Sequence, residues 1–289
     1  MSGDRTVKST RRSRPMSSAC GRIGDQGREK VAARVQSLGA TLVRLRKLTR
    51  VDIEDGRVSA LRFAMPIPHP PSQPHQTTVP TGPEERWTDF DAVILAIPAP
   101  CLQEVLPPEA LTLPGLSGIP RITTVAPLAM QVWHRACVTE GPRTVVCGLP
   151  ESLGFVVDNK SNYPHLRNDP AFGASLHFVG QETGFEDMED EELLERSLTG
   201  VRRIPGWEGF DRQGVIDFTV VRSRGPHRRY WNSEPGSLPF EPFTRTPIRS
   251  LYLAGDWIRS QLDFPCMENA VRTGRQAVAA LHDDLGGVS

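Results

Sequence analysis

The stretch SLYLAGDWIRSQLDFPCMENAVRTGRQAVAAL, residues 250–281, decides the fold expected of this chain. It predicts a short buried strand at Leu251–Ala254, then Gly255 and Asp256, a loop and a long helix. In parallel α/β sheets, ligands bind beyond the carboxyl ends of the strands. A glycine there lets a ligand approach the backbone, and a carboxylate accepts hydrogen bonds from hydroxyl groups. The sequence therefore predicts a ligand site at Gly255 and Asp256.

The predicted helix has one apolar side, on which Met267, Ala270, Val271, Gly274 and Val278 recur at helical spacing. Ala270 and Gly274 are small enough to allow close packing of this helix against a sheet. Its first N–H groups lack partners within the helix and lie at the positive end of the dipole, which suits an electron-rich ligand atom. The plain alternative is that this strand and helix only close the core.

Upstream of this stretch, the sequence predicts a helix from Arg28 to a stop at Gly39, followed by a hairpin that turns at Glu54–Gly56. Residues 66–83 hold seven prolines and are expected to form an exposed loop. The continuous apolar run Val93–Ile97 is typical of a strand buried on both faces.

The composition sets limits on the partners of the chain. There are 34 Lys and Arg residues and 34 Asp and Glu residues, so no nucleic-acid partner is expected. Five cysteines form no CxxC pair, which favours a reducing intracellular compartment such as the cytoplasm or a plastid, and no metal site is predicted. No apolar run approaches the ~20 residues that span a bilayer. The basic, aromatic segment 222–231 leaves a peripheral membrane contact open.

Residues 123–235 read mostly as strands with one acidic amphipathic helix, and segments of αβ type bracket them. The predicted fold class is therefore α/β, with an α+β mixture in the middle.

Three motifs, in order along the chain, resemble the FAD-dependent amine oxidase and carotenoid (phytoene) desaturase superfamily, which includes hydroxysqualene dehydroxylases. LYLAGDW with MENAVRTG is similar to the C-terminal signature of that superfamily, and FDAVILAIPAP to its returning strand. LGATLVRLRKLTRVDIEDGRV is similar to the hairpin along the adenine end of the flavin. The resemblance covers about residues 28–285. It implies an FAD-dependent oxidoreductase that transfers hydride to flavin from a small apolar, isoprenoid-like substrate or from an amine.

The resemblance also implies where FAD would be bound. Asp256 would contact the ribityl or pyrophosphate part, and Gly255 would leave room for it. Met267 and Glu268 would face the isoalloxazine ring, with Asn269 behind them. The full set of implied FAD-binding residues is Leu48, Ala96, Pro98, Gly255, Asp256, Trp257, Met267, Glu268 and Ala270. No catalytic acid or base can be named.

The superfamily begins with a GxGxxG βαβ unit, which this sequence lacks; GRIGDQG at residues 21–27 has no strand before it. The prediction is thus an incomplete FAD/NAD(P)-binding Rossmann-like domain with a strand-rich substrate domain. Its parts are a disordered basic tail (1–27), a partial FAD-binding region (28–122), the substrate domain (123–235) and a C-terminal FAD-binding strand–loop–helix (236–289). Unpaired strand edges and exposed apolar faces are expected.

Three explanations of the missing unit remain open: a partial gene product or mis-predicted gene model, a second chain that completes the sheet and the FAD site, or a remnant that no longer binds flavin. The corresponding alternatives for function are a truncated, non-catalytic binding or scaffold module and a flavin-free protein that binds an apolar ligand.

Overall fold

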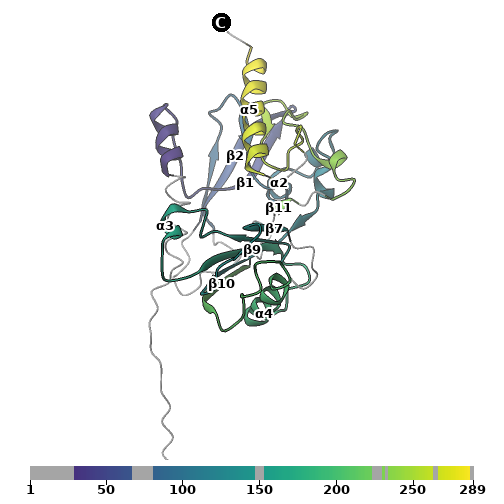
Figure 1. Cartoon of the computed structure of the whole chain (residues 1–289). Helices are drawn as coiled ribbons and strands as arrows, with labels where there is room; N and C mark the ends of the chain where they lie inside the picture. Colours follow the sequence, from purple (N-terminus) through teal and green to yellow (C-terminus); the bar gives the residue numbers. More distant parts are fainter. Residues whose placement is uncertain are drawn as a thin grey trace, which may run out of the picture. The chain divides into compact units, whose positions relative to one another are not determined.

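The computed structural model describes residues 29–66, 81–146, 153–222, 230–231, 234–262 and 266–286, and the predicted tail 1–27 lies outside them. The chain divides into two compact units, Met1–Arg44 and Leu45–Ser289 (Figure 1). In the first unit, residues 29–37 form the predicted helix, and the chain turns at Gly39, where φ is 93°. Across the described residues, no helix combines the length and the apolar composition needed to cross a bilayer.

The predicted hairpin is present in the second unit as β1 (Lys47–Glu54) and β2 (Arg57–Pro66). Asp55 and Gly56 have φ values of 50° and 69°, the left-handed pair that a tight two-residue hairpin turn requires. The prediction of a loop over 66–83 is wrong at its ends, because Pro66 closes β2 and residues 81–83 begin β3 (Thr81–Trp87). β3 is an edge strand of the order β1-β2-β3, where a proline need not donate to a neighbour.

A two-stranded parallel sheet joins β4 (Val93–Leu95) to β12 (Leu251–Leu253). Val93 and Leu95 are buried, but Ile94 is 37% exposed, so the prediction of a strand buried on both faces is wrong for its outer face. The reason is that β4 pairs with β12 alone among the described strands. Parallel sheets are normally covered on both faces, which Ile94 shows is not the case here. Since β4 has a neighbour on one side only among the described strands, the predicted unpaired edge is present at β4.

One apolar core unites the two chain segments that flank the strand-rich middle. It includes residues of the hairpin, of β4, of the short helix α2 (Ala99–Val105) and of β12, among them Val51, Leu102 and Leu253. The helix α5 (Met267–Asp284) packs on β12 through a smaller cluster. The predicted domain boundaries stay a prediction, but residues 48–122 and 240–258 both contribute to this core.

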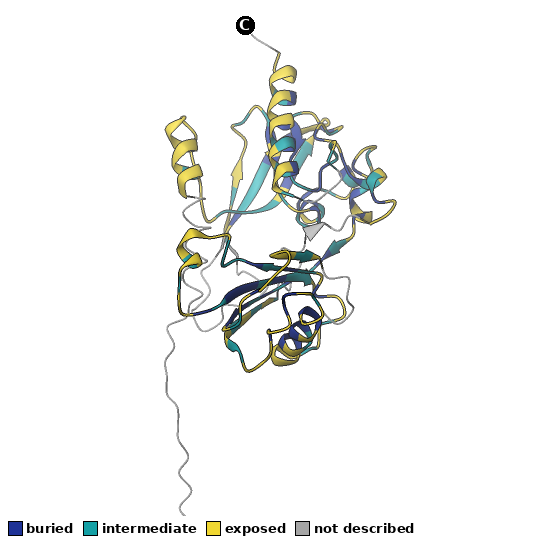
Figure 2. Cartoon of the chain, in the orientation of Figure 1, coloured by how far each residue is buried: buried dark blue, intermediate teal, exposed yellow. Residues whose placement is uncertain are grey.

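The middle of the chain forms an antiparallel five-stranded sheet in the order β10-β6-β9-β8-β7. The helix α4 (Asp190–Val201) covers one face of it, and a second core containing Phe178, Leu194 and Trp207 lies between them (Figure 2). The first turn of α4 carries Asp190, Glu191 and Glu192, where the helix dipole favours acids. The strands are β6 (Pro127–His134), β7 (Thr144–Val146), β8 (Phe155–Asp158), β9 (Ala174–Gln181) and β10 (Val215–Arg222).

The remaining elements are short. They are η1 (Ala110–Thr112), η2 (Ile119–Arg121), β5 (Thr124–Val125), α3 (Pro164–Arg167), β11 (Tyr230–Trp231) and η4 (Leu238–Phe240), with β5 and β11 paired to each other.

Candidate functional site

A cavity of about 470 Å³ lies at the carboxyl ends of β4 and β12, where parallel sheets bind their ligands. The turn after β4 forms one wall, the Gly–Asp after β12 another, and α5 a third through Ala270 and Gly274. The structure thus brings six of the nine predicted FAD-binding residues to one cavity: Ala96, Pro98, Gly255, Asp256, Trp257 and Ala270.

The Asp256 carboxyl group is half-buried in this cavity and has no ion-pair partner among the described residues. Burial raises its pKa above the usual value, and the backbone N–H groups of Asp256 and Trp257 partly offset that rise. A carboxylate without a cation nearby keeps acceptor sites for hydroxyl groups of a ligand. It can therefore select a ligand that carries several hydroxyl groups.

Burying half of the unpaired Asp256 carboxylate costs desolvation free energy at neutral pH. We therefore expect Asp256→Asn to stabilise the folded chain at that pH. Because the folded-state pKa is raised, the stability that Asp256 contributes is present below its unfolded pKa, near 3.8, and is lost as the pH rises through the folded value. We expect the variant to exceed the wild type by on the order of 0.5 kcal/mol at pH 7, since water still screens a half-exposed group. Thermal unfolding at pH 7 and at pH 3.5 measures this, and the difference should vanish at the lower pH. A less stable variant at pH 7 would contradict it.

Gly255 has a backbone conformation that favours glycine, while the predicted approach of a ligand to it stays a prediction. Its φ is 147°, and a Cβ there would lie 3.1 Å from the Trp257 ring. Its N–H donates to Thr273 Oγ1 at 3.0 Å, and the Thr273 hydroxyl donates back to Gly255 O at 2.8 Å. Thr273 is fully buried and was not among the predicted site residues. The only sequence signal for Thr273 was its spacing, since a polar residue four positions after Asn269 lies on the same side of a helix.

A second contact between α5 and the loop comes from Asn269, which is 1% exposed. Its Nδ2 donates to Asp256 O at 2.7 Å and to Ile258 O at 3.3 Å. Ser260 Oγ donates to Asn269 Oδ1 at 2.5 Å and accepts from the Leu262 N–H at 2.9 Å. Asn269 and Thr273 therefore fix the loop that carries Asp256 to the helix beside the cavity.

The predicted packing side of α5 is wrong. Met267 is 87% exposed and Val271 and Val278 are each 58% exposed, while a Cβ added to Gly274 would meet no atom within 4 Å. The buried residues of α5 are instead Asn269, Thr273, Ala277 and Ala280. Apolar periodicity could not show this, because the buried side is defined by hydrogen bonds to the loop and by small alanines against β12.

The other predicted residues lie away from the cavity walls or have a second role. Trp257 is 3% exposed and donates from Nε1 to Ile97 O at 2.9 Å, so it also closes the first core. Leu48 packs against that core, and neither Met267 nor Glu268 lines the cavity. The roles implied for Leu48, Met267 and Glu268 stay predictions. In the described part of the chain, no group of three His, Cys, Asp or Glu side chains is placed to hold a metal ion.

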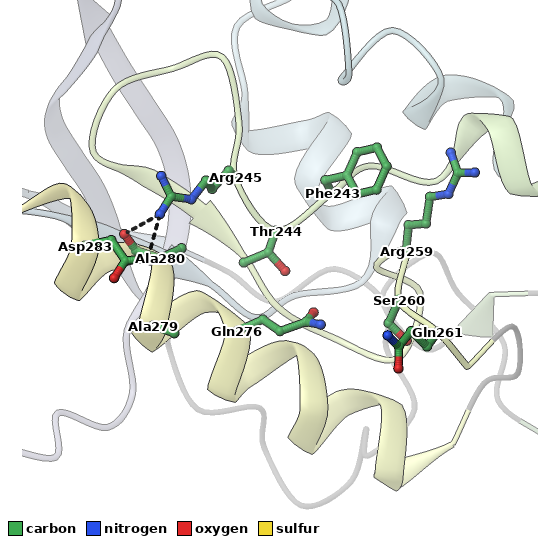
Figure 3. Close-up of a pocket in the computed structure, with 10 residues that line it drawn as sticks. All are labelled: Phe243, Thr244, Arg245, Arg259, Ser260, Gln261, Gln276, Ala279, Ala280 and Asp283. Atoms are coloured by element: carbon green, nitrogen blue, oxygen red, sulfur yellow. Dashed lines mark hydrogen bonds and ion pairs between the residues drawn. The ribbon is translucent and has the colours of Figure 1, made fainter.

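A different cavity, of about 540 Å³, lies between α5 and residues 243–245 (Figure 3). Arg245 pairs there with Asp283 and Asp284, and the buried Thr244 Oγ1 has no hydrogen-bond partner. None of the predicted site residues lines this cavity, and the charge of Arg245 is already matched by two carboxylates. We therefore centre the candidate site on Asp256.

Comparison with known proteins agrees with the geometry around Asp256. The family model described as flavin containing amine oxidoreductase matches residues 37–282. The chain belongs to this family. The resemblance inferred from LYLAGDW and MENAVRTG is thereby confirmed.

The chain is distant in sequence from its individual relatives. It is 24% identical to a 15-cis-phytoene desaturase of Synechococcus elongatus over 222 residues, which are 71% of this chain and 43% of the relative. It is 22% identical to the chloroplastic/chromoplastic 15-cis-phytoene desaturase of Narcissus pseudonarcissus over 197 residues, 67% of this chain and 34% of the relative. The chain thus spans between a third and a half of the length of these relatives.

The fold of this family member agrees with a solved structure. Cyclohexylamine oxidase from Brevibacterium oxydans superposes with a TM-score of 0.50 at 16% identity, covering 83% of this chain and 48% of the oxidase. This likeness bears on the fold, and it confirms the predicted α/β, Rossmann-like class.

Proposed function

We propose that this chain is part of an FAD-dependent oxidoreductase and that it binds the ribityl and isoalloxazine side of the cofactor at Asp256. The observation that carries the proposal is the half-buried carboxylate without a counter-charge, next to a glycine, at the carboxyl end of a parallel strand. When bound, the flavin supplies the redox chemistry by accepting a hydride from the substrate.

The residues of the chain fit one part of FAD. Asp256 has free acceptor sites for the ribityl hydroxyls, and the apolar walls at Ala96, Pro98 and Ala270 suit a flat aromatic ring and exclude water from it. Asn269 and Thr273 hold the backbone carbonyls of Asp256 and Gly255, and thus the loop that carries the carboxylate. The described residues contain no GxGxxG turn for the pyrophosphate. We propose that this remaining surface is supplied by polypeptide outside the described residues, such as a second chain.

The substrate we propose is a small apolar molecule with an oxidisable C–H or C–N bond, either isoprenoid-like or an amine. The support is the naming of the relatives, which are phytoene desaturases in one group and a cyclohexylamine oxidase in the other. The alternative of a chain that binds an apolar ligand without flavin would use the same cavity walls, but it gives Asp256 no role.

Flavin retention tests the proposal. The chain is incubated with FAD, desalted and examined for absorption near ~370 and ~450 nm, with the affinity measured by titration. Asp256→Ala should weaken binding by about 10- to 100-fold, the usual value of hydrogen bonds to a charged group. Asp217→Ala, which removes an exposed carboxylate on β10, is the matched control and should bind as the wild type does. Equal FAD affinity of the wild type and Asp256→Ala in the titration would refute the proposed role of Asp256.

A further inference from the structure

One face of the five-stranded sheet packs with α4 through side chains such as Leu128 and Phe178 (Figure 2). On the opposite face, the strand registers align side chains in rows that cross all five strands. One row consists of Thr219, Gln131, His177, Val157 and Thr144. The next row is apolar throughout and consists of Val221, Ala129, Val179, Phe155 and Val146. We call these two rows the open face.

The open face belongs to none of the apolar cores formed by the described residues, since no side chain of either row packs into one. Its two ends are exposed, at 56% for Val221 and 78% for Val146. Its middle, at Ala129, Val179 and Phe155, is half-buried. The open face is therefore an apolar surface that a small molecule can reach.

The imidazole of His177 is held in one tautomer by Gln131. Gln131 Nε2 donates to Leu176 O and to Ser175 Oγ, each at 3.0 Å. A carbonyl oxygen only accepts, so the amide nitrogen of Gln131 lies on that side and its Oε1 lies on the other, 3.2 Å from His177 Nδ1. Because Oε1 also only accepts, Nδ1 carries the proton. Burial lowers the pKa of His177, so the ring is neutral at pH 7 and Nε2 has a free lone pair.

The surroundings of His177 Nε2 indicate which ligand it can accept a hydrogen bond from. In the described part of the chain, no donor bonds to Nε2. Asp217, opposite Trp133, is the only charged side chain that the five strands place on this side of the sheet. A free acceptor beside an apolar row, with a carboxylate and no cation on the same side, suits a molecule with an apolar body and a cationic N–H donor.

We propose that the open face binds the apolar part of an amine substrate and that His177 Nε2 accepts a hydrogen bond from its ammonium group. The inference rests on the proposed function, which leaves both amines and isoprenoid-like molecules open, and it selects the amine. A hydrocarbon has no N–H or O–H donor, so it would cover His177 and leave Nε2 unpaired, at a cost in affinity. An ammonium group meets no repulsion from a neutral imidazole, and its charge strengthens the hydrogen bond.

NMR of the histidine ring nitrogens during titration with n-hexylamine tests the proposal on the full chain without added FAD. His177 Nε2 of the wild type should be unprotonated at pH 7 and should shift as the amine binds, with a dissociation constant in roughly the millimolar range. N,N,N-Trimethylhexylammonium has the same charge and alkyl chain but no N–H group, and should bind about tenfold more weakly or worse. Hexan-1-ol should also bind more weakly than the amine, because its hydrogen bond is not charge-assisted.

Variants separate His177 from the apolar row. His177→Asn keeps a donor for Gln131 near the place of Nδ1 and removes Nε2, so it should weaken n-hexylamine binding about tenfold or more. His282→Asn, at an exposed position on α5, is the matched control and should bind as the wild type does. Val179→Thr keeps the shape of the side chain and adds a hydroxyl to the apolar row, so it should weaken binding about threefold. It keeps the test valid if circular dichroism shows that His177→Asn is unfolded.

Equal affinity for n-hexylamine and its trimethyl analogue overturns the proposal, and so does wild-type affinity in both His177→Asn and Val179→Thr. Equal binding of hexan-1-ol and the amine overturns the choice of an amine. Absence of amine binding by the wild type overturns the proposal too. That result leaves the proposed function untouched, because the FAD titration of Asp256→Ala tests it without any amine.

Discussion

Leucine in place of Asn269 is expected to lower the free energy of unfolding by about 3 kcal/mol and to reduce flavin binding together with it. The two side chains are similar in shape, so the substitution removes hydrogen bonds and leaves little cavity. The buried carbonyls of Asp256 and Ile258 lose their donor, and the Ser260 hydroxyl loses its acceptor. Each buried polar group left unpaired costs about 1–3 kcal/mol.

The effect on flavin follows from the position of the lost contacts. Asn269 holds the backbone of Asp256 itself, so the carboxylate is released from its place when the amide is removed. We expect a weakening of FAD binding of about tenfold or more at a temperature where the variant is fully folded. Asn269 is thus a positioning residue that acts through Asp256.

Urea unfolding and FAD titration measure the two effects on the same variant. Gln276→Leu is the matched control, since it replaces an exposed amide of the same helix and should change stability by less than about 0.5 kcal/mol. Ser260→Ala removes one partner of Asn269 and should cost about 1 kcal/mol. A loss below about 1 kcal/mol in Asn269→Leu, with flavin affinity unchanged, would show that the contact does not hold the loop.

Local signals in the sequence predicted the elements around the site correctly. The hairpin follows from Asp55–Gly56, a dipeptide that tolerates two left-handed residues, and the strand before Gly255 follows from a short apolar run. The parallel pairing of β4 with β12 depends on contacts between distant segments, and no local signal in the sequence indicated it.

Sequence reasoning failed where polar residues took the place of apolar ones in the interior. The most apolar side of α5 was expected to be its packing side, but Thr273 and Asn269 are the buried residues and Val271 and Val278 face water. A period of 3.6 residues identifies an amphipathic helix, and it does not say whether the apolar side meets the same chain or another surface. That distinction requires the hydrogen bonds to Gly255 and Asp256, which only the structure provides.

Alanine in place of Gly173 is expected to destabilise the strand-rich core by about 3–4 kcal/mol, the largest change predicted for any single methyl group here. A Cβ at Gly173 would overlap Arg135 O and lie 2.5 Å from Ala136 O, and both atoms belong to the backbone. Backbone atoms cannot rotate away as a side-chain end can. The Gly173 N–H also donates to His134 O at 2.7 Å, so any separation breaks this bond and the β6–β9 pairing that begins beside it.

Gly154→Ala is the matched control for Gly173→Ala, because a Cβ at Gly154 would meet nothing within 4 Å and its φ is not left-handed. It should be neutral or raise stability slightly by restricting the unfolded chain. Urea unfolding followed by tryptophan fluorescence reports on this region, since Trp133 and Trp207 are both buried there. Equal stabilities of the two variants would contradict the close approach of the Arg135 and Ala136 backbone to Gly173.

Gly173→Ala and Asn269→Leu should differ in their effect on FAD affinity. This difference tests which part of the chain binds the flavin. Gly173 directly precedes β9 of the five-stranded sheet, whereas Asp256 follows β12 and Asn269 lies in α5. Under conditions where both variants are folded, Gly173→Ala should keep the FAD affinity of the wild type and Asn269→Leu should not. A loss of affinity in Gly173→Ala equal to that in Asn269→Leu would place part of the flavin site in the strand-rich region instead.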